Sequence, residues 1–338
     1  MQNTRYYYNI LNEDEKKIYK AIYDGILHYK NQVKVPDVSL SDQRVAYVYK
    51  AVLWDNPFFF SVGEHAMQKA VSQDKQSISI TRLCDENTEK LYREKVQRVV
   101  NKILNIPGLK EMSDFQKEVF VHDFIINNVE YDHTLGDGGK RLEPYTVYGV
   151  FVEKKAVCEG IAKAVKLLLN LLDVKCIIVD GTVDGERHSW NIVKLKDFSY
   201  NLDVTFDMGK VSNNGHMRYD YFNFRDADDT RRVLDNEHRM PKCSAIEYNY
   251  VIKAGGFVSN KERLILYMEN CLNKHKPCMY IKINNNVSGE FDNLTKDQFL
   301  NVIGEALYEA QKKAGIKVQA MIDDCGIMGI TSLEITYI

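Results

Sequence analysis

Three residues in the middle of the chain have the side chains, and the order, that thiol-based acyl transfer requires. They are Cys158, His188 and Asp203. A thiol becomes a good nucleophile when a nearby imidazole takes up its proton, and a carboxylate can fix the tautomer and the orientation of that imidazole. We therefore expect the sulfur of Cys158 to attack a carbonyl carbon, with His188 as the base and Asp203 as the group that orients the histidine.

Cys158 lies at the beginning of a predicted helix. Four apolar residues follow it at the spacing of one buried helical face: Ile161, Val165, Leu168 and Leu172. The free N–H groups and the dipole of a helix favour negative charge at its N-terminus. This position therefore favours the thiolate form of the sulfur, and it offers the backbone N–H of the cysteine to a developing oxyanion.

Three strand patterns after this helix predict an antiparallel meander. They cover residues 175–182, 188–195 and 200–207. Asp184-Gly185, between the first two, is a strong signal for a hairpin. A helix followed by such a meander is an α+β arrangement.

The second hairpin is expected to turn at Leu195 and Lys196. In that register, His188 and Asp203 oppose each other on adjacent strands, with Cβ atoms about 4.5–5.5 Å apart. This spacing suits a hydrogen bond between an imidazole and a carboxylate.

Short blocks around these residues resemble the transglutaminase-like superfamily and come in the order of that family. The blocks are Val-Cys-Glu-Gly at 157–160, His-Ser-Trp-Asn at 188–191 and Asp-Val-Thr at 203–205. Residues 122–132 and 145–149 are also similar to the family, so the resemblance covers about residues 115–210. The remaining parts of the chain are similar to bacterial members, but less specifically.

The resemblance implies a papain-like Cys–His–Asp core with Cys158 as nucleophile, His188 as base and Asp203 as orienting acid. The second oxyanion donor of the family is assigned to Tyr148, although the alternative for this tyrosine is an aromatic residue of the core. Trp190 is expected to pack beside the site. Asn191 is expected either to support His188 or to satisfy a strand edge.

The chain as a whole is expected to be α+β, in three regions. Residues 1–110 are a mostly helical N-terminal region, residues 111–245 the transglutaminase-like catalytic core, and residues 246–338 a small α+β C-terminal unit. In the first region, Asn12 and Glu15 are spaced as a capping box, residues 77–81 alternate as a strand, and residues 58–60, three consecutive phenylalanines, suggest a short buried strand.

The C-terminal unit is predicted from two helical and three strand patterns. The helices are expected at 261–273 and from 295 to about 315, and the strands at 279–283, 318–322 and 331–337. No chemistry is visible there, so this unit is interpreted as a scaffold or a partner surface.

Charge and hydropathy exclude several classes of protein. The 338 residues hold 45 Lys and Arg against 47 Asp and Glu, which argues against a nucleic-acid partner, because that would need a basic face. No run approaches the ~20 apolar residues of a membrane helix. The first residues lack the apolar segment of a signal peptide, so we expect a cytoplasmic protein; a secreted protein whose leader has been removed would begin in the same way.

Neither a disulfide framework nor a metal site is expected. The seven cysteines are scattered and form no C-x-x-C pair. His216, His238 and Cys243 have metal-capable side chains but not the spacing of a metal motif. No cofactor is predicted. The charged run at 225–232 is interpreted as a solvated helix or loop.

The first reading of function is cysteine-dependent acyl transfer at an amide, ending in hydrolysis of a peptide or protein substrate through a thioester. Water needs no second substrate pocket, and bacterial relatives look more protease-like than crosslinking. The alternatives are transglutaminase-type crosslinking and a catalytically silent binding or scaffold module. The sequence leaves the oligomeric state open.

Overall fold

The computed structural model describes residues 5–36, 40–63, 67–72, 75–82, 84–134, 141–209, 217–235, 239–283, 290–291, 294–325 and 329–338. The chain forms two compact units. The first consists of Met1–Ser199, Asp203–Thr205 and Arg231–Lys242, and the second of Tyr200–Leu202, Phe206–Thr230 and Cys243–Ile338. The predicted α+β class is confirmed.

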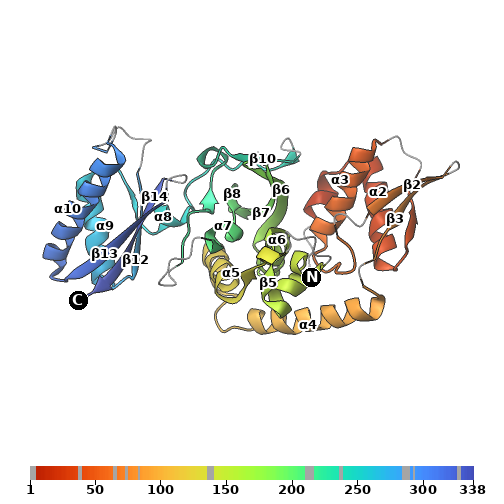
Figure 1. Cartoon of the computed structure of the whole chain (residues 1–338), viewed down its shortest axis with the longest axis horizontal. Helices are drawn as coiled ribbons and strands as arrows, with labels where there is room; N and C mark the ends of the chain where they lie inside the picture. The colour runs from red at the N-terminus through yellow and green to blue at the C-terminus, as the bar shows by residue number, and fades with distance from the viewer. Residues whose placement is uncertain are drawn as a thin grey trace. The chain divides into compact units, whose positions relative to one another are not determined.

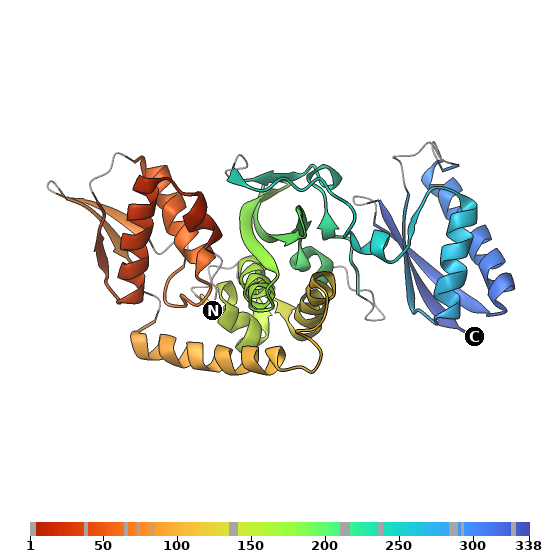
Figure 2. The ribbon, with the colours of Figure 1, turned by 180° about the vertical axis from the view of Figure 1, so that it is seen from behind.

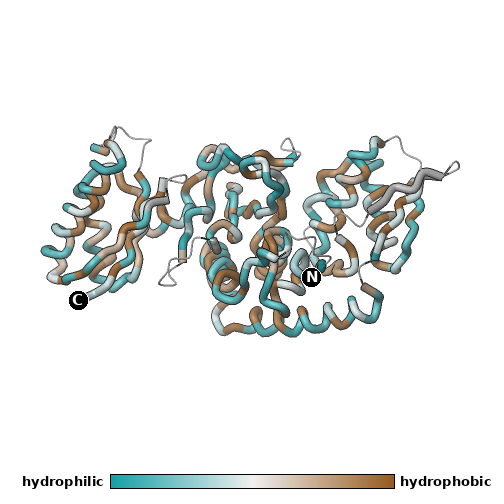
Figure 3. The backbone as a smooth tube through the Cα atoms, viewed as in Figure 1, coloured by the Kyte–Doolittle hydropathy of each residue, from teal (hydrophilic) through white to brown (hydrophobic). Residues whose placement is uncertain are grey.

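Among the residues that the structure describes, four helices and a small sheet make up the N-terminal part of the first unit. The helices are α1 (Tyr6–Ile10), α2 (Glu13–Leu27), α3 (Asp42–Asp55) and α4 (Glu86–Leu104). The sheet has the order β1-β3-β2, from Gln32–Lys34, Lys75–Ile80 and Met67–Ser72. Helix α2 begins where predicted, because Asn12 and Glu15 form the capping box. Helix α4 alternates between hydrophilic and hydrophobic residues along its length (Figure 3), as an amphipathic helix does.

The predicted strand at residues 58–60 is wrong, because these residues form turns. The Phe58 carbonyl accepts a hydrogen bond from the Arg93 side chain at 3.1 Å rather than from a neighbouring strand. The Phe58 and Phe60 rings meet edge to face at 5.9 Å between centroids. Aromatic packing, rather than strand pairing, therefore explains this run.

Helix α1 is attached to the sheet that follows much later in the chain. The Tyr7 hydroxyl donates a hydrogen bond to the Ile178 carbonyl. The backbone N–H groups of Tyr7 and Tyr8 donate to the buried carboxylate of Asp55 at 3.2 and 3.0 Å. These bonds join the first helix to both α3 and the central sheet.

The central part of the chain contains two long helices and a five-stranded sheet. The helices are α5 (Asp114–Asn128) and α6 (Cys158–Leu171). The sheet has the order β10-β6-β7-β8-β9, with β6 Lys175–Val183, β7 Glu186–Leu195, β8 Phe198–Leu202, β9 Phe222–Phe224 and β10 Arg232–Leu234. Helix α6 packs against α5 and against β6 and β7 (Figures 1 and 2). The predicted helix followed by an antiparallel hairpin is confirmed.

The turn between β6 and β7 forms as predicted. Asp184 and Gly185 both have positive φ angles, 52° and 86°, as a type I′ turn requires. This turn fixes the register of the hairpin, in which Gly181 pairs with His188 and Val179 with Trp190.

The predicted third strand is wrong in its second half. The chain turns at residues 196–197, one position later than expected, and β8 ends at Leu202. Asp203 is not in a strand, and α7 (Val204–Met208) begins directly after it. The buried Asp207 carboxylate accepts a hydrogen bond from the Tyr221 N–H at 2.9 Å, and this contact fixes the short helix where β-branched residues favoured a strand.

Short elements connect α5 to α6. They are β4 (Glu130–Tyr131), which runs parallel to β5 (Lys155–Ala156), and the helical turns η3 (Glu143–Tyr145) and η4 (Gly149–Glu153). A further turn of helix, η5 (Asp226–Asp228), follows β9.

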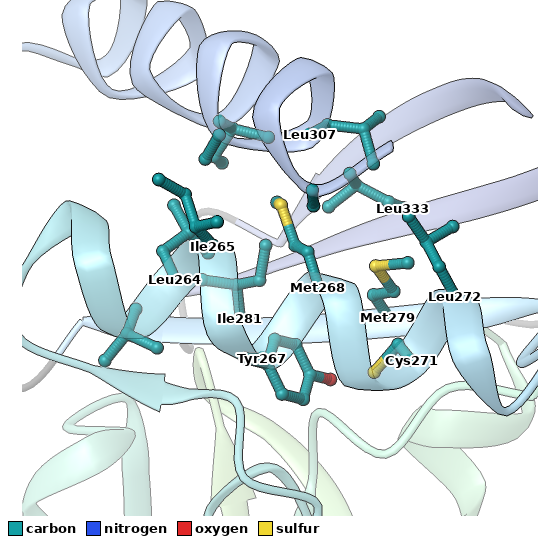
Figure 4. Close-up of a cluster of buried hydrophobic side chains, with 14 of the residues drawn as sticks. Leu264, Ile265, Tyr267, Met268, Cys271, Leu272, Met279, Ile281, Leu307 and Leu333 are labelled. Atoms are coloured by element: carbon teal, nitrogen blue, oxygen red, sulfur yellow. The ribbon is translucent and has the colours of Figure 1, made fainter. Parts of the chain in front are cut away.

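In the described residues, the C-terminal part of the second unit is a four-stranded sheet with three helices. The elements are α8 (Tyr250–Lys253), β11 (Phe257–Val258), α9 (Lys261–Asn273), β12 (Cys278–Ile283), α10 (Lys296–Ala314), β13 (Val318–Cys325) and β14 (Ile330–Tyr337), and the sheet order is β11-β12-β14-β13. The predicted helices and strands are confirmed. Figure 4 shows Met268 of α9, Leu307 of α10 and Leu333 of β14 in one hydrophobic core.

Candidate active site

Cys158 is the first residue of α6, as the sequence predicted. The residue before it, Val157, is extended (φ −99°, ψ 176°), and its N–H donates to the Pro144 carbonyl at 3.1 Å. A Cβ at Gly160 would lie 2.3 Å from that same carbonyl oxygen. Only glycine therefore lets the first turn of the helix approach the segment around Pro144 this closely.

His188 and Asp203 form the hydrogen bond that the sequence analysis expected. Nε2 of His188 lies 2.7 Å from Oδ2 of Asp203, and both side chains are buried. The contact does not use directly opposed strand residues, because Asp203 follows the end of β8. Its carboxylate reaches His188 from the short connection to α7.

His188 also forms a hydrogen bond with Cys158. Burial alone would lower the pKa of His188, but the Asp203 carboxylate and the contacts with Asp203 and Cys158 raise this pKa to about 9. Burial alone would raise the pKa of Asp203, but His188 and Arg232 hold it well below its usual range. At neutral pH the site therefore contains a carboxylate and a protonated imidazole.

Arg232 is a site residue that sequence reasoning missed. Its guanidinium donates to Oδ2 of Asp203 at 2.8 Å, and its side chain is only 6% exposed. The interpretation of residues 225–232 as a solvated run is therefore wrong for Arg232. It begins β10, whose three residues are too few to give a strand pattern, and it lies 29 positions after Asp203. No sequence signal joins these two residues.

Trp190 lies beside the site. Its ring is nearly parallel to that of His188, with centroids 5.9 Å apart and an interplanar angle of 16°. The Arg232 guanidinium lies over the Trp190 ring at 5.0 Å from the centroid, which is a cation–π contact. Trp190 thus touches both residues that bond to Asp203.

Asn191 has a different place from the two that were considered. Its Nδ2 donates to the Ala162 carbonyl of α6 at 3.0 Å and to the Ile177 carbonyl of β6 at 3.1 Å. Successive strand residues point to opposite faces, so Asn191 projects from the face opposite His188. It fastens α6 to the sheet and does not support the imidazole directly.

Tyr131, rather than Tyr148, lies against the nucleophile. The Tyr131 hydroxyl is hydrogen-bonded to both the thiol and the backbone N–H of Cys158. Burial and the neighbouring sulfur raise the pKa of Tyr131 to about 12, so the hydroxyl keeps its proton. The ring of Tyr148 stacks instead on Tyr92 of α4, with centroids 3.8 Å apart.

The backbone explains why Tyr131 reaches Cys158. Tyr131 pairs with Ala156 in the parallel β4–β5 ladder, and the Asp132 N–H donates to the Ala156 carbonyl at 2.9 Å. Tyr131 belongs to the stretch 122–132 that resembles the family, and this resemblance was the signal that could have indicated its role.

A buried carboxylate supports the strand that carries His188. Oδ1 of Asp180 on β6 accepts a hydrogen bond from the Ser189 hydroxyl at 2.7 Å, and its Oδ2 lies 3.3 Å from Nζ of Lys50 on α3. Asp180 thus ties β7 and α3 together next to the histidine.

Within the described ranges, no cluster of three or more His, Cys, Asp or Glu side chains is arranged to hold a metal ion. His216 and His238 lie outside these ranges. The Cys243 N–H donates to the Asp226 carboxylate at 2.9 Å. None of the helices that the structure describes combines the length and the apolar character needed to cross a membrane.

Comparison with known proteins matches one segment of the chain to a known family. Residues 105–204 match the family model described as the Transglutaminase-like superfamily. These residues include Cys158, His188 and Asp203, but not Arg232. No curated protein sequence matches the chain significantly.

Two solved structures are similar to the chain at low identity. One, described as "Crystal structure of a TGase", is 13% identical with a TM-score of 0.30, over 54% of this chain and 51% of that chain. The other, described as "Crystal structure of menin reveals the binding site for Mixed Lineage Leukemia (MLL) protein", is 15% identical with a TM-score of 0.26, over 68% of this chain and 43% of that chain. The chain therefore spans about half the length of the first structure and less than half the length of the second.

Proposed function

Because residues 105–204 belong to the transglutaminase-like superfamily, we propose that this protein is an enzyme that hydrolyses peptide or amide bonds through a thioester on Cys158. The observation that carries the proposal is the continuous chain of hydrogen bonds from Asp203 through His188 to Cys158 at the first turn of α6. The substrate class that we propose is a peptide or a protein.

The first half of the reaction forms the acyl-enzyme. The Cys158 thiolate attacks the carbonyl carbon of the amide, and a C–S bond forms. Protonated His188 gives its proton to the leaving nitrogen, the C–N bond breaks, and the amine departs. The Asp203 carboxylate keeps the imidazole in the orientation that this transfer needs.

The second half restores the enzyme. Neutral His188 takes a proton from water, and the water oxygen attacks the thioester carbon. The C–S bond breaks, the carboxylic acid leaves, and the thiolate and the protonated imidazole are formed again. Because His188 first gives and then takes one proton, no other proton carrier is required.

Tyr131 supports this mechanism as the second oxyanion donor. An oxyanion forms next to the sulfur in both halves, within reach of the Cys158 N–H. In the resting site the Tyr131 hydroxyl accepts from this N–H and donates to the sulfur. It therefore lies where the oxyanion forms, and we assign it the role predicted for Tyr148, with its O–H turning from the sulfur to the oxyanion when substrate binds.

The test of the nucleophile is alkylation by iodoacetamide, followed by mass spectrometry of each cysteine. We expect Cys158 to be alkylated faster than the other cysteines, because it lies at the N-terminus of α6 and beside His188. Cys84 and Cys278 are natural controls, since burial raises the pKa of each thiol to about 11. Substitution of His188 by Ala should lower the alkylation rate of Cys158 and leave the rates of Cys84 and Cys278 unchanged.

An equal rate at Cys158, Cys84 and Cys278 would mean that the thiolate–imidazole pair does not form. The fold would then serve as a binding or scaffold module.

A second experiment separates hydrolysis from crosslinking. A pool of peptides is incubated with the protein in H₂¹⁸O, with monodansylcadaverine as a competing amine. Hydrolysis places ¹⁸O in newly formed carboxylates, whereas transamidation attaches the dansyl amine to glutamine. We expect the first product and not the second, and Cys158→Ala should abolish it. Dansylation without ¹⁸O would assign the protein to crosslinking.

A further inference from the structure

Arg232 has a contact that the proposed chemistry does not by itself require. Oδ2 of Asp203 accepts a hydrogen bond from Arg232 at 2.8 Å, and the same oxygen lies 2.7 Å from Nε2 of His188. One carboxylate oxygen is therefore shared between a permanent cation and the catalytic imidazole. Solvent screens buried charges much less than exposed ones, so this sharing has a large electrostatic effect.

The guanidinium is held in this place from two sides. Its Cζ lies 5.0 Å from the centroid of the Trp190 ring, and the Trp190 ring in turn lies against His188. The four side chains thus form a closed cluster in which Asp203 and Trp190 each contact both His188 and Arg232.

The backbone of β10 delivers Arg232 to this cluster. Arg232 pairs with Val183 in the antiparallel β10–β6 ladder. The Asp235 N–H, at the end of β10, donates to the Asp180 carbonyl at 2.9 Å, and the Asp235 carboxylate binds the Arg187 guanidinium at 3.1 and 2.9 Å. These contacts hold the strand, and with it the arginine, against β6.

We propose that Arg232 is a positioning residue that fixes the Asp203 carboxylate and limits how strongly this carboxylate stabilises protonated His188. The proposal deepens the proposed function and rests on it. A carboxylate that is partly neutralised by a guanidinium attracts an imidazolium less, and the two cations also repel each other. His188 therefore gives its proton to the leaving amine more readily than it would beside an unpaired carboxylate.

The test must separate the effect of Arg232 on His188 from the effects of the other charged groups nearby. Asp203 faces His188 and Arg232, and His188 faces Asp203 and Cys158. Because the Cys158 side chain contacts the imidazole, a Cys158→Ala background is needed to observe the histidine alone.

The experiment is a nuclear magnetic resonance titration of the imidazole of His188 in the full chain carrying Cys158→Ala, with the signal assigned by its loss in His188→Gln. Adding Arg232→Gln removes the charge and keeps an amide donor, so we expect the titration midpoint to rise by about one pH unit. Arg232→Lys keeps the charge, and its midpoint should stay close to that of the Cys158→Ala parent. A merely structural arginine would give no such difference between the two variants.

A midpoint that is unchanged or lower in Arg232→Gln would overturn the proposal. If that variant does not unfold cooperatively, Gly181→Ala carries the same test. A Cβ at Gly181 would lie 2.1 Å from the Val233 carbonyl oxygen and would move β10 and its arginine away from Asp203. An unchanged midpoint there would equally overturn the proposal. The proposed function is tested by alkylation of Cys158 in the wild type, and the role of Arg232 by titration of His188 in Cys158→Ala. Failure of one can therefore be distinguished from failure of the other.

Discussion

Gly181 of β6 and His188 of β7 are directly paired across the hairpin of the central sheet. Strand β10 lies on the other side of β6, and this position must be glycine. A Cβ there would lie 2.1 Å from the Val233 carbonyl oxygen and 2.9 Å from Cη2 of Trp190. The residue opposite the histidine thus lets β10 approach β6 closely enough to bring Arg232 to the site.

Gly181→Ala should destabilise the protein. The backbone of β10 cannot yield without losing its ladder to β6, so we expect a loss of roughly 1–3 kcal/mol in the free energy of unfolding. Urea denaturation followed by circular dichroism measures it. Gly304→Ala is the matched control, because nothing lies within 4 Å of its Cβ and alanine favours a helix. Equal midpoints for the two variants would show that β10 does not need the glycine.

Tyr131→Phe should impair amide hydrolysis. Hydrolysis passes through an oxyanion, so we expect kcat to fall by about 10²-fold or more when this donor is removed. Tyr148→Phe is the control, because that ring stacks on Tyr92, and its kcat should stay close to that of the wild type. The reverse pattern, with Tyr148→Phe impaired, would return the oxyanion role to Tyr148.

The pH dependence of stability should carry the signature of His188. Its pKa is raised in the folded protein, from an ordinary 6.5 to about 9. The folded state therefore gains stability that is fully present below about pH 6.5 and is lost as the pH rises through about 9, amounting to roughly 3 kcal/mol. Urea unfolding of the wild type and of His188→Gln at pH 6 and at pH 9.5 measures this contribution.

The difference between these two proteins should be large at pH 6 and small at pH 9.5. Taking the difference in the free energy of unfolding cancels the contributions of the histidines and thiols that both proteins share. A difference that stays constant across this range would contradict a protonated His188 in the folded state.

Asn191→Ala should destabilise the packing of α6 on the sheet. The substitution leaves the Ala162 and Ile177 carbonyls without their side-chain donor in a buried place, and we expect a cost of roughly 2–4 kcal/mol. The urea midpoint measures it. Asn128→Ala is the comparison, because Asn128 bonds the Phe124 carbonyl at an exposed position and should cost well under about 1 kcal/mol. Similar losses would show that Asn191 does not fasten the helix.

The sequence predicted the parts of the site that depend on local pattern. The helical spacing after Cys158 located the start of α6, and Asp184-Gly185 located the hairpin turn, because both signals act within a few residues of the structure that they specify. The pairing of His188 with Asp203 was also predicted, although by a strand geometry that is wrong. The carboxylate reaches the imidazole from a connection whose course depends on the distant contact of Asp207 with Tyr221.

The parts that were missed depend on contacts between distant segments. Arg232 is brought to Asp203 by a three-residue strand, and Tyr131 is brought to Cys158 by a two-residue ladder. Elements this short leave no periodic pattern in the sequence. Which tyrosine faces the sulfur, and which arginine faces the carboxylate, is therefore decided by tertiary packing alone.

The hydrogen bond from Tyr7 to the Ile178 carbonyl has a practical consequence for cutting this protein into fragments. The segment that matches the family model begins at residue 105 and ends at residue 204, whereas Tyr7 precedes it and Arg232 follows it. A fragment with these limits would lack Tyr7, which donates a hydrogen bond to the Ile178 carbonyl of β6. It would also lack Arg232, the cation beside Asp203. We therefore expect such a fragment to be poorly folded. A fragment that keeps the site intact must extend beyond residues 105–204 in both directions.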